Sequence, residues 1–255
     1  MMISVCGVSV SGKGKTHNED QIFCQGHFRK NGSQDDFYHG MLDTEESCIF
    51  AIFDGIGGLK YGEIASKECA EELNRIMLEN KNRDSSVDSI NSIIRINRRI
   101  AGRKEKIGST AVIAQCCRNN LQIANIGDSR AYFQSGSKLI LLTEDHTLEQ
   151  QMKQIHKDYG IDYHEKEYQK HALTQYIGVP ESEFIIEPYE KKLIVNKGEQ
   201  CLLCSDGLSD VIDDHQLSSV LMQEISIKEK VNMLLDMALK PEKTDNISII
   251  IIRWE

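Results

Sequence analysis

The chain has 255 residues, of which 40% are hydrophobic, so it can bury a sizeable core. It has three prolines, no Gly/Ser-rich spacer and no recurring period, and we expect one domain over residues 1–255. A net charge of −9 argues against nucleic acid or an anionic membrane as partner, and no run approaches the roughly eighteen apolar residues of a spanning helix. We therefore expect a cytoplasmic protein.

The first half of the chain reads as strands, then two helices, then more strands. Strands are expected near residues 2–10, 20–28 and 47–54, and helical apolar stripes cover 61–78 and 89–101. Further strands are expected at 109–117, 121–126, 131–134 and 138–142. The breaks at 118–120 and 135–137 are typical of hairpin turns, so this part of the sheet should be antiparallel.

The second half begins with a polar, irregular stretch over residues 145–175. After it we expect strands at 184–189 and 200–205, two helices within 213–239, and a last strand from residue 246. This order lacks the regular alternation of a doubly wound parallel sheet. A β-sandwich flanked by helices fits it better.

The most informative stretch spans residues 47–58, where an apolar run ends at Asp54 and enters a glycine-rich turn. A strand buried on both faces cannot bury an ionised carboxylate, so Asp54 should lie just beyond the covered part. Taken alone, an Asp-Gly pair is more typical of a hairpin turn.

Acidic residues recur at strand ends in three other places. Asp206 follows one apolar run, Asp245 precedes another, and Glu19 with Asp20 precedes a third. Carboxylates gathered from such distant positions repel one another unless cations lie between them. Oxygen ligands without histidine favour Mg²⁺ or Mn²⁺ over Zn²⁺. The sequence therefore predicts a hard-cation site.

Seven motifs, in this order, resemble those of the metal-dependent serine/threonine protein phosphatases, the PPM or protein phosphatase 2C-like family. They are NED at 18–20, DGIGG at 54–58, GST at 108–110, GDSRAY at 127–132, TEDH at 143–146, SDGL at 205–208 and DNIS at 245–248. The resemblance implies an α+β fold, a four-layer αββα sandwich of two mainly antiparallel sheets flanked by helix pairs. It also implies a binuclear Mn²⁺ or Mg²⁺ site at one edge of the sandwich.

The resemblance assigns roles to the acidic residues. Asp54 would bridge both metals, Gly55 would offer its carbonyl, and Asp206 and Asp245 would bind one metal. Glu19 with Asp20 would bind the other, directly or through water. The expected catalytic residues are thus Asp54, Asp206 and Asp245. Asp128 resembles a third-metal position, and an equal alternative is a turn carboxylate that bonds the backbone of Ser129 and Arg130.

The implied reaction is hydrolysis of phosphoserine and phosphothreonine on proteins. A metal-activated water is expected to attack phosphorus in line, without a covalent phosphoenzyme. None of the eight cysteines lies in a loop of Cys-x5-Arg type, which argues against a cysteine nucleophile.

Two positions depart from the family pattern. Lys15 stands where the family usually has an arginine that grips the substrate phosphate, so it is the candidate phosphate ligand. Lys13 of the same loop is an equal candidate, and Lys15 could instead be solvated. Ile56 stands where some members carry a histidine proposed as the leaving-group acid, which leaves that proton to water.

Residues 144–175 lie where the family places a variable flap beside the active site. The alternative is a solvated helix and loop that does not contact substrate. Its histidines, at 156, 164 and 171, are more typical of exposed residues than of metal ligands.

Two other functions stay open: a catalytically silent relative that binds phosphoproteins, and a hydrolase of small phosphoesters. For the favoured function, the expected partners are phosphorylated proteins that a serine/threonine kinase has modified. The chain itself is expected to be a monomer.

Overall fold

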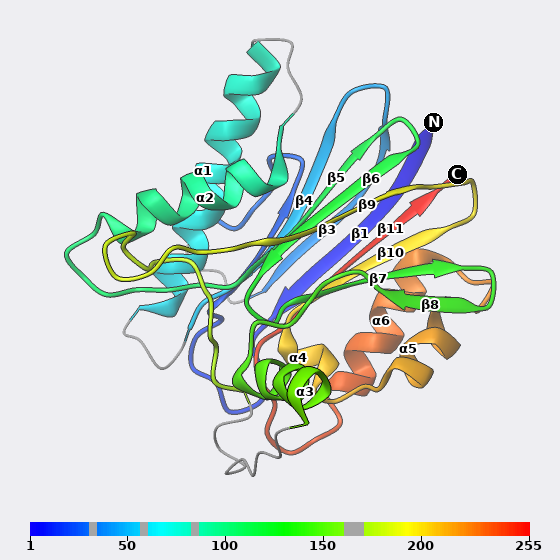
Figure 1. Ribbon diagram of the computed structural model, residues 1–255. Helices are drawn as coiled ribbons and strands as arrows, with labels where there is room; N and C mark the ends of the chain where they lie inside the picture. The colour runs from blue at the N-terminus through cyan, green and yellow to red at the C-terminus, as the bar shows by residue number, and fades with distance from the viewer. Residues whose placement is uncertain (31–34, 57–60, 83–86, 161–170) are drawn as a thin grey trace.

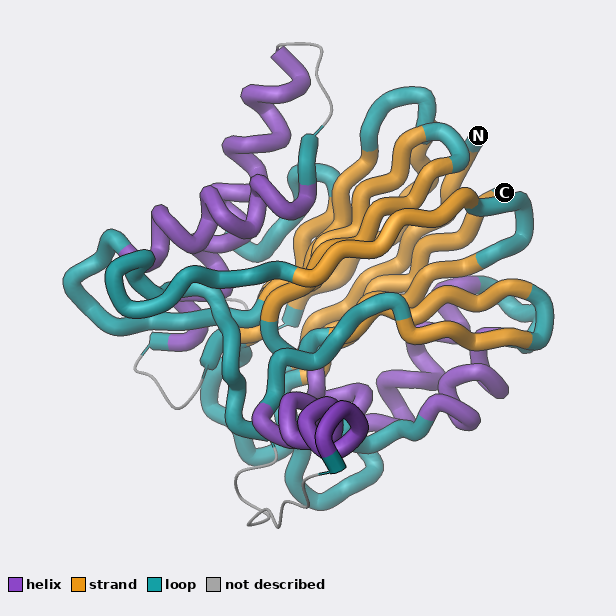
Figure 2. The backbone as a smooth tube through the Cα atoms, viewed as in Figure 1, coloured by secondary structure: helices purple, strands orange, loops and turns teal. Residues whose placement is uncertain are grey.

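The structure is a computed structural model that describes residues 1–30, 35–56, 61–82, 87–160 and 171–255. Two antiparallel sheets pack face to face, and helices cover the outer face of each (Figures 1 and 2). The four-layer αββα sandwich expected from the sequence is confirmed. Gly57, Gly58 and His164 lie outside the described residues.

The first sheet has the strand order β3-β1-β11-β10-β7-β8. These strands span Asp36–Asp43, Met2–Val10, Ile247–Trp254, Gln200–Cys204, Arg130–Ser135 and Lys138–Leu141. Its outer face is covered by α4 (Asp206–Ser209), α5 (Asp214–Leu221) and α6 (Ile227–Ala238). The last strand along the chain, β11, therefore lies near the middle of the sheet, between β1 and β10.

The second sheet has the order β2-β4-β5-β6-β9. Its strands span Asp20–Cys24, Cys48–Asp54, Ala111–Cys117, Asn120–Ile126 and Tyr189–Ile194. The helices α1 (Gly62–Asn82) and α2 (Ser89–Ala101) pack on its outer face. The helix α3 (Leu148–Tyr159) lies apart from these layers, near the end of the sandwich where α4 begins (Figure 1).

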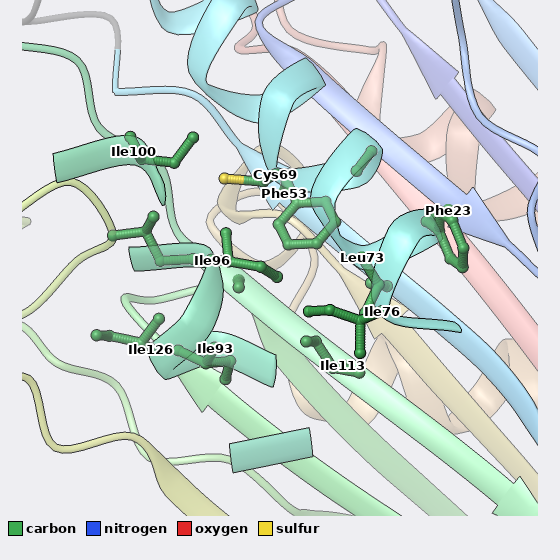
Figure 3. Packing of buried hydrophobic residues seen from close by; sticks show 14 of the residues in the cluster. Phe23, Phe53, Cys69, Leu73, Ile76, Ile93, Ile96, Ile100, Ile113 and Ile126 are labelled. Carbon is green, nitrogen blue, oxygen red and sulfur yellow. The ribbon is translucent and has the colours of Figure 1, made fainter. Parts of the chain in front are cut away.

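The apolar runs supply both faces of the buried strands. In β4, Phe50 and Ile52 point between the sheets, whereas Phe53 points to α1 and α2. Figure 3 shows Phe53 beside Cys69 of α1 and near Ile96 of α2. Since both faces of β4 are covered by apolar side chains, the strand stays buried until Asp54, where it leaves the core.

The strand β3 was not expected from the sequence, and two of the expected strands differ from the structure. The strand expected at 184–189 is wrong: the amides of Glu183 and Phe184 bond to Pro180 O in a turn, and β9 begins only at Tyr189. The strand expected at 20–28 ends at Cys24, because Gln25 (φ 49°) and Gly26 (φ 91°) form a tight turn.

The helix α3 lies inside the stretch expected to be irregular. Thr147 caps its start by accepting a hydrogen bond from Gln150 N at 3.3 Å, and Gly160 ends it in a left-handed conformation with φ 67°. None of its residues is buried, although Leu148, Met152, Ile155 and Tyr159 recur at helical spacing. The helix could therefore have been predicted from this spacing, and the many charged and amide residues around it concealed the pattern.

None of the described helices combines the length and the apolar character that a membrane crossing requires. All eight cysteines are free thiols, and seven are buried. Burial raises the pKa of Cys6 and of Cys48 to about 11, which disfavours a nucleophilic thiolate at either position.

Candidate active site

One pocket of about 560 Å³ gathers most of the residues singled out from the sequence. They come from loops and strand ends of both sheets, and they are Lys15, Glu19, Asp54, Gly55, Ile56, Asp128, Asp206 and Asp245. Thr110, Tyr176 and the segment from His171 to Leu173 complete the lining. The pocket lies at the edge of the sandwich where the apolar runs end.

Asp20 and Asp54 lie directly opposite one another on the antiparallel strands β2 and β4. Paired residues project to the same face of a sheet, and here that face is the one turned toward the other sheet. Asp20 is buried, with 1% of its surface exposed. The two carboxylates therefore enter the gap between the sheets side by side.

Asp54 is held from its backbone. Its amide donates to Thr110 Oγ1 at 3.2 Å, and its carbonyl accepts from Thr110 N at 2.8 Å and from Ser109 Oγ at 2.9 Å. Thr110 Oγ1 is in turn 2.7 Å from Ser129 Oγ. The GST and GDS motifs thus fix the direction in which the carboxylate of Asp54 leaves β4.

Asp20 is held by hydroxyls of the opposite sheet. Ser205 Oγ and Ser248 Oγ each donate to Asp20 Oδ2 at 2.7 Å, and both serines are fully buried. The other oxygen, Asp20 Oδ1, is buried with no hydrogen-bond partner. One side of the carboxylate is fixed and the other is left unpaired.

Burial and mutual repulsion raise the pKa values of the clustered carboxyls. Burial raises the pKa of Asp20 to about 7 and that of Asp206 to about 6, with further contributions from Asp245 in both cases. The pKa of Asp54 is raised well above its usual value by burial and then by the charges of Asp20 and Asp206. Such a cluster resists ionisation unless positive charge compensates it.

The glycines allow backbone and carboxylate oxygens to approach one another. A Cβ at Gly62 would stand 2.7 Å from Glu19 Oε1 and 2.9 Å from the carbonyl oxygen of Gly55, so both oxygens face the same small space. A Cβ at Gly55 would meet Gly62 O at 2.1 Å. The sequence pointed to Gly55 but not to Gly62, which has no motif of its own.

Divalent cations fit this site by donor type. Apart from His171, which lies beside Asp210, the donors are oxygens. Asp206 Oδ1, like Asp20 Oδ1, is buried without a partner. In the present arrangement no three Asp, Glu, His or Cys side chains of the described residues converge closely enough to hold an ion. Asp245 instead pairs with Lys15, whose Nζ lies 2.7 Å from its Oδ1.

Asp128 lines the pocket and is half-buried. Burial raises its pKa to about 8, and the charges of Asp206 and Asp145 add to the shift. Its carboxylate accepts a hydrogen bond from its own backbone amide, which lowers the pKa in part.

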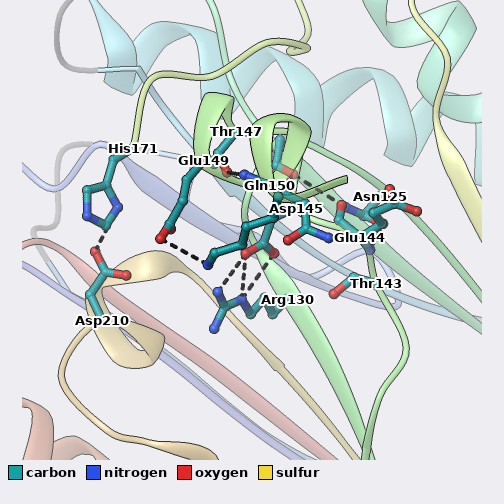
Figure 4. A network of polar contacts seen from close by, with 12 residues as sticks. Asn125, Arg130, Thr143, Glu144, Asp145, Thr147, Glu149, Gln150, His171 and Asp210 are labelled. Atoms are coloured by element: carbon teal, nitrogen blue, oxygen red, sulfur yellow. Dashed lines mark hydrogen bonds and ion pairs between the residues drawn. The ribbon is translucent and has the colours of Figure 1, made fainter. Parts of the chain in front are cut away.

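The region from 144 to 175 meets the pocket at His171, Ala172 and Leu173. Arg130 anchors its start, because Nε and Nη2 donate to Asp145 at 2.6–3.1 Å (Figure 4). His171 Nδ1 lies 3.6 Å from Asp210 Oδ2, between the pocket and the helix α4. The sequence had singled out His171 only as an exposed loop residue.

Comparison with known proteins decides the family. A model of the family described as "Protein phosphatase 2C" matches residues 5–152. The chain belongs to the protein phosphatase 2C family. It is accordingly a metal-dependent protein serine/threonine phosphatase, of a family that uses Mn²⁺ or Mg²⁺.

Bacterial protein phosphatases resemble the chain over most of its length. The serine/threonine phosphatase stp of Listeria welshimeri is 26% identical over 228 residues, covering 84% of this chain and 87% of its own. The protein phosphatase PhpP of Streptococcus pneumoniae is 26% identical over 239 residues, covering 88% and 93%.

Solved structures share the fold. The serine/threonine phosphatase of S. agalactiae has a TM-score of 0.79 at 23% identity and covers 99% of this chain and 100% of its own. The catalytic domain of the phosphatase PstP, solved in complex with two manganese ions, has a TM-score of 0.72 at 22% identity, with 99% of each chain covered.

Proposed function

We propose that the pocket is the catalytic centre, and that Glu19, Asp20, Asp54, Asp206 and Asp245, with the carbonyl of Gly55, hold two Mn²⁺ or Mg²⁺ ions. The observation that carries this proposal is the meeting of carboxylates from both sheets in one pocket, which Asp206 lines with a buried and unpaired Oδ1. Asp20 is not in the pocket lining but lies opposite Asp54 on the neighbouring strand, and its Oδ1 is also buried and unpaired. An unpaired buried carboxylate oxygen is costly, and a cation would satisfy it.

When bound, the ions supply positive charge against the phosphate and a water acidic enough to act as nucleophile. The protein fixes the geometry: Thr110 and Ser109 hold the backbone at Asp54, and Ser205 with Ser248 holds one oxygen of Asp20. Asp54, Asp206 and Asp245 are the residues on which turnover should depend.

Lys15 is the proposed ligand of the substrate phosphate, since its ammonium lies in the same pocket as Asp54. A lysine holds phosphate as a point charge, without the planar fork of arginine. Ile56 lines the pocket and has no proton to give, so the leaving serine or threonine alkoxide takes its proton from water. Water and phosphoester thereby yield the free hydroxyl and inorganic phosphate.

Asp128 is proposed to hold a third cation. Its half-buried carboxyl has Asp206 and Asp145 as charged neighbours, and a cation would offset that repulsion. Its position in the pocket lining supports this role more than that of an isolated turn residue.

The substrates are proposed to be phosphoproteins modified by a serine/threonine kinase, which the chain meets as a cytoplasmic monomer with one domain over residues 1–255. We assign the flap to residues 144–175. The contact of His171, Ala172 and Leu173 with the pocket supports a part in substrate selection.

The test is phosphate release from a phosphothreonine peptide and from p-nitrophenyl phosphate, each with Mn²⁺, with Mg²⁺ and with excess EDTA. We expect metal-dependent release from the peptide and none with EDTA. Full activity in EDTA would contradict the proposed metal site. Release from the aryl ester alone would favour a small-phosphoester hydrolase, and release from neither would favour a phosphoprotein-binding relative.

A further inference from the structure

The loop that carries Lys15 is fastened to the loop that carries Asp245. Gly12 N donates to Asn246 Oδ1 at 3.2 Å, and Lys13 N donates to Thr244 Oγ1 at 2.8 Å. A Cβ at Gly12 would stand 2.1 Å from the carbonyl oxygen of Asp245, so the two backbones touch. The backbone that carries Lys15 is therefore held against the loop of Asp245 by the side chains of Thr244 and Asn246 and by the close approach of Gly12.

Within this unit Lys15 and Asp245 form an ion pair. Lys15 Nζ lies 2.7 Å from Asp245 Oδ1, and the side chains keep 38% and 52% of their surface exposed. Partial burial opposes the charged form of Lys15, but the hydrogen bond to Asp245 and the charges of Asp245 and Glu19 outweigh it and raise its pKa. The ammonium is thus a stable positive charge inside the carboxylate cluster.

A divalent cation and the ammonium of Lys15 compete for the carboxylate of Asp245. Both need its carboxylate, and two positive charges on the same oxygen repel each other strongly at such short range. In the structure it is the ammonium that lies against the carboxylate, with Asp245 Oδ1 2.7 Å from Lys15 Nζ.

We propose that Lys15 is the internal counter-ion of the metal site: its ammonium neutralises Asp245 in the metal-free protein, and a divalent cation displaces it toward the substrate phosphate. This inference rests on the proposed metal site. It gives Lys15 two successive partners, first a metal ligand and then the phosphate. It orders the two binding events, since the phosphate ligand is released only when the metal has bound.

The inference predicts opposite effects of one substitution on two ligands. Lys15→Met should tighten Mn²⁺ binding, because no ammonium has to be displaced, while it weakens binding of phosphate. A half-exposed ion pair makes a modest contribution, so we expect a Mn²⁺ dissociation constant about two- to tenfold lower. Lys13→Met removes the same charge from the same loop and is the matched control, with an expected change of less than about twofold.

The experiment is a calorimetric Mn²⁺ titration of chelator-stripped protein without substrate, for the wild type and both variants, after thermal unfolding has shown that each is folded. In a second measurement, mass spectrometry follows acetylation of lysine amines by a soluble reagent. Mn²⁺ should increase the acetylation of Lys15 in the wild type and leave that of Lys13 unchanged.

The outcomes separate the inference from the proposed function. If the wild type binds Mn²⁺ but Lys15→Met binds it equally or less tightly, the counter-ion role is wrong and the metal site stands. Equal tightening by Lys13→Met would show a general charge effect and would also overturn the inference. If the wild type binds no Mn²⁺, both the metal site and the counter-ion role fail.

Discussion

The hydroxyl of Ser248 donates a 2.7 Å hydrogen bond to Asp20 Oδ2 and so joins β11 of the first sheet to β2 of the second. Ser9 Oγ lies 2.9 Å from Ser248 Oγ and accepts from Asn18 Nδ2 at 2.9 Å. Buried polar side chains therefore form a chain from Asn18 through Ser9 and Ser248 to the carboxylate of Asp20. Removing one hydroxyl disturbs a proposed metal ligand without changing its charge.

For this reason Ser248→Ala should weaken Mn²⁺ binding about tenfold, as the loss of a group that orients a metal ligand commonly does. The lost hydrogen bond should lower the free energy of unfolding by about 1 kcal/mol. Calorimetry and urea unfolding measure the two effects. Ser4→Ala, which removes an exposed hydroxyl that bonds Glu255, is the control and should leave both unchanged. Unaltered Mn²⁺ affinity in Ser248→Ala would show that Asp20 needs no such support.

Asp54→Asn and Asp206→Asn should each lower kcat on a phosphothreonine peptide by orders of magnitude, because each removes a charge that offsets the proposed cations. The matched control is Asp236→Asn, an exposed carboxyl on α6. Steady-state rates at saturating Mn²⁺ report the effect. Variants that keep wild-type turnover would place the reaction somewhere other than this pocket.

Lys15→Ala should raise KM for phosphopeptides and weaken competitive inhibition by inorganic phosphate about tenfold, since a charge-assisted hydrogen bond contributes roughly 1.5 to 3 kcal/mol. Lys15→Arg should lower KM, because its fork holds two phosphate oxygens. Inhibition constants for Lys15→Ala and Lys13→Ala distinguish the two lysines, as only the true ligand loses the effect. If neither loses it, the metals alone hold the phosphate.

Ile56→His should narrow the gap between aryl phosphates and phosphothreonine peptides in chemical rate. A phenolate leaves without a proton, whereas a threonine alkoxide benefits from an acid beside it. Ile56 lines the pocket and packs close to Gly108. An imidazole ring in place of Ile56 would therefore border the pocket. Single-turnover rates on both substrates are the measurement. An unchanged peptide rate in a folded variant would mean that proton donation does not limit the reaction.

Lys230 of α6 makes stability depend on pH. It is 2% exposed and donates to Gln200 Oε1 at 2.8 Å and to Leu221 O at 2.6 Å. Burial, and secondarily the charge of Arg253, lower its pKa to about 8, whereas an unfolded lysine has a value of about 10.4. Below pH 8 both states hold the proton, and the folded state bears the full cost of the buried charge.

Between those two pKa values the folded state releases the proton before the unfolded state does, so folding becomes more favourable as pH rises. The stability of the wild type relative to Lys230→Met should therefore increase by about 1 to 3 kcal/mol from pH 7 to 10. Urea unfolding at several pH values measures this. The exposed Lys240→Met is the control, and parallel pH curves for the wild type and Lys230→Met would refute the assignment.

The acidic residues of the site could be predicted because a buried strand has to end where a carboxylate appears, as at Asp54 and Asp206. The serines that hold Asp20 could not, because Ser205 and Ser248 are 185 and 228 residues away from it in sequence. Hydrogen bonds across two sheets leave no local pattern. The Lys15–Asp245 pair escaped prediction for the same reason.

The failure to predict the edge strands β3 and β9 has another cause. In β3 every second residue is exposed, and β9 carries Glu190, Lys191 and Lys192. Charge and partial exposure protect an edge strand from pairing with other chains, and they also remove the apolar signal by which a strand is recognised.

The central place of β11 has a consequence for the order in which the protein can form during synthesis. Until Ile247–Trp254 leaves the ribosome, β1 and β10 have no strand between them, and Asp245 is not yet held against the Gly12 loop. The second sheet can assemble with α1 and α2 while translation continues, because all its strands come earlier in the chain. A nascent chain can therefore have a partly built core before Asp245 is in place, and the proposed catalytic centre is completed only when β11 has joined β1 and β10.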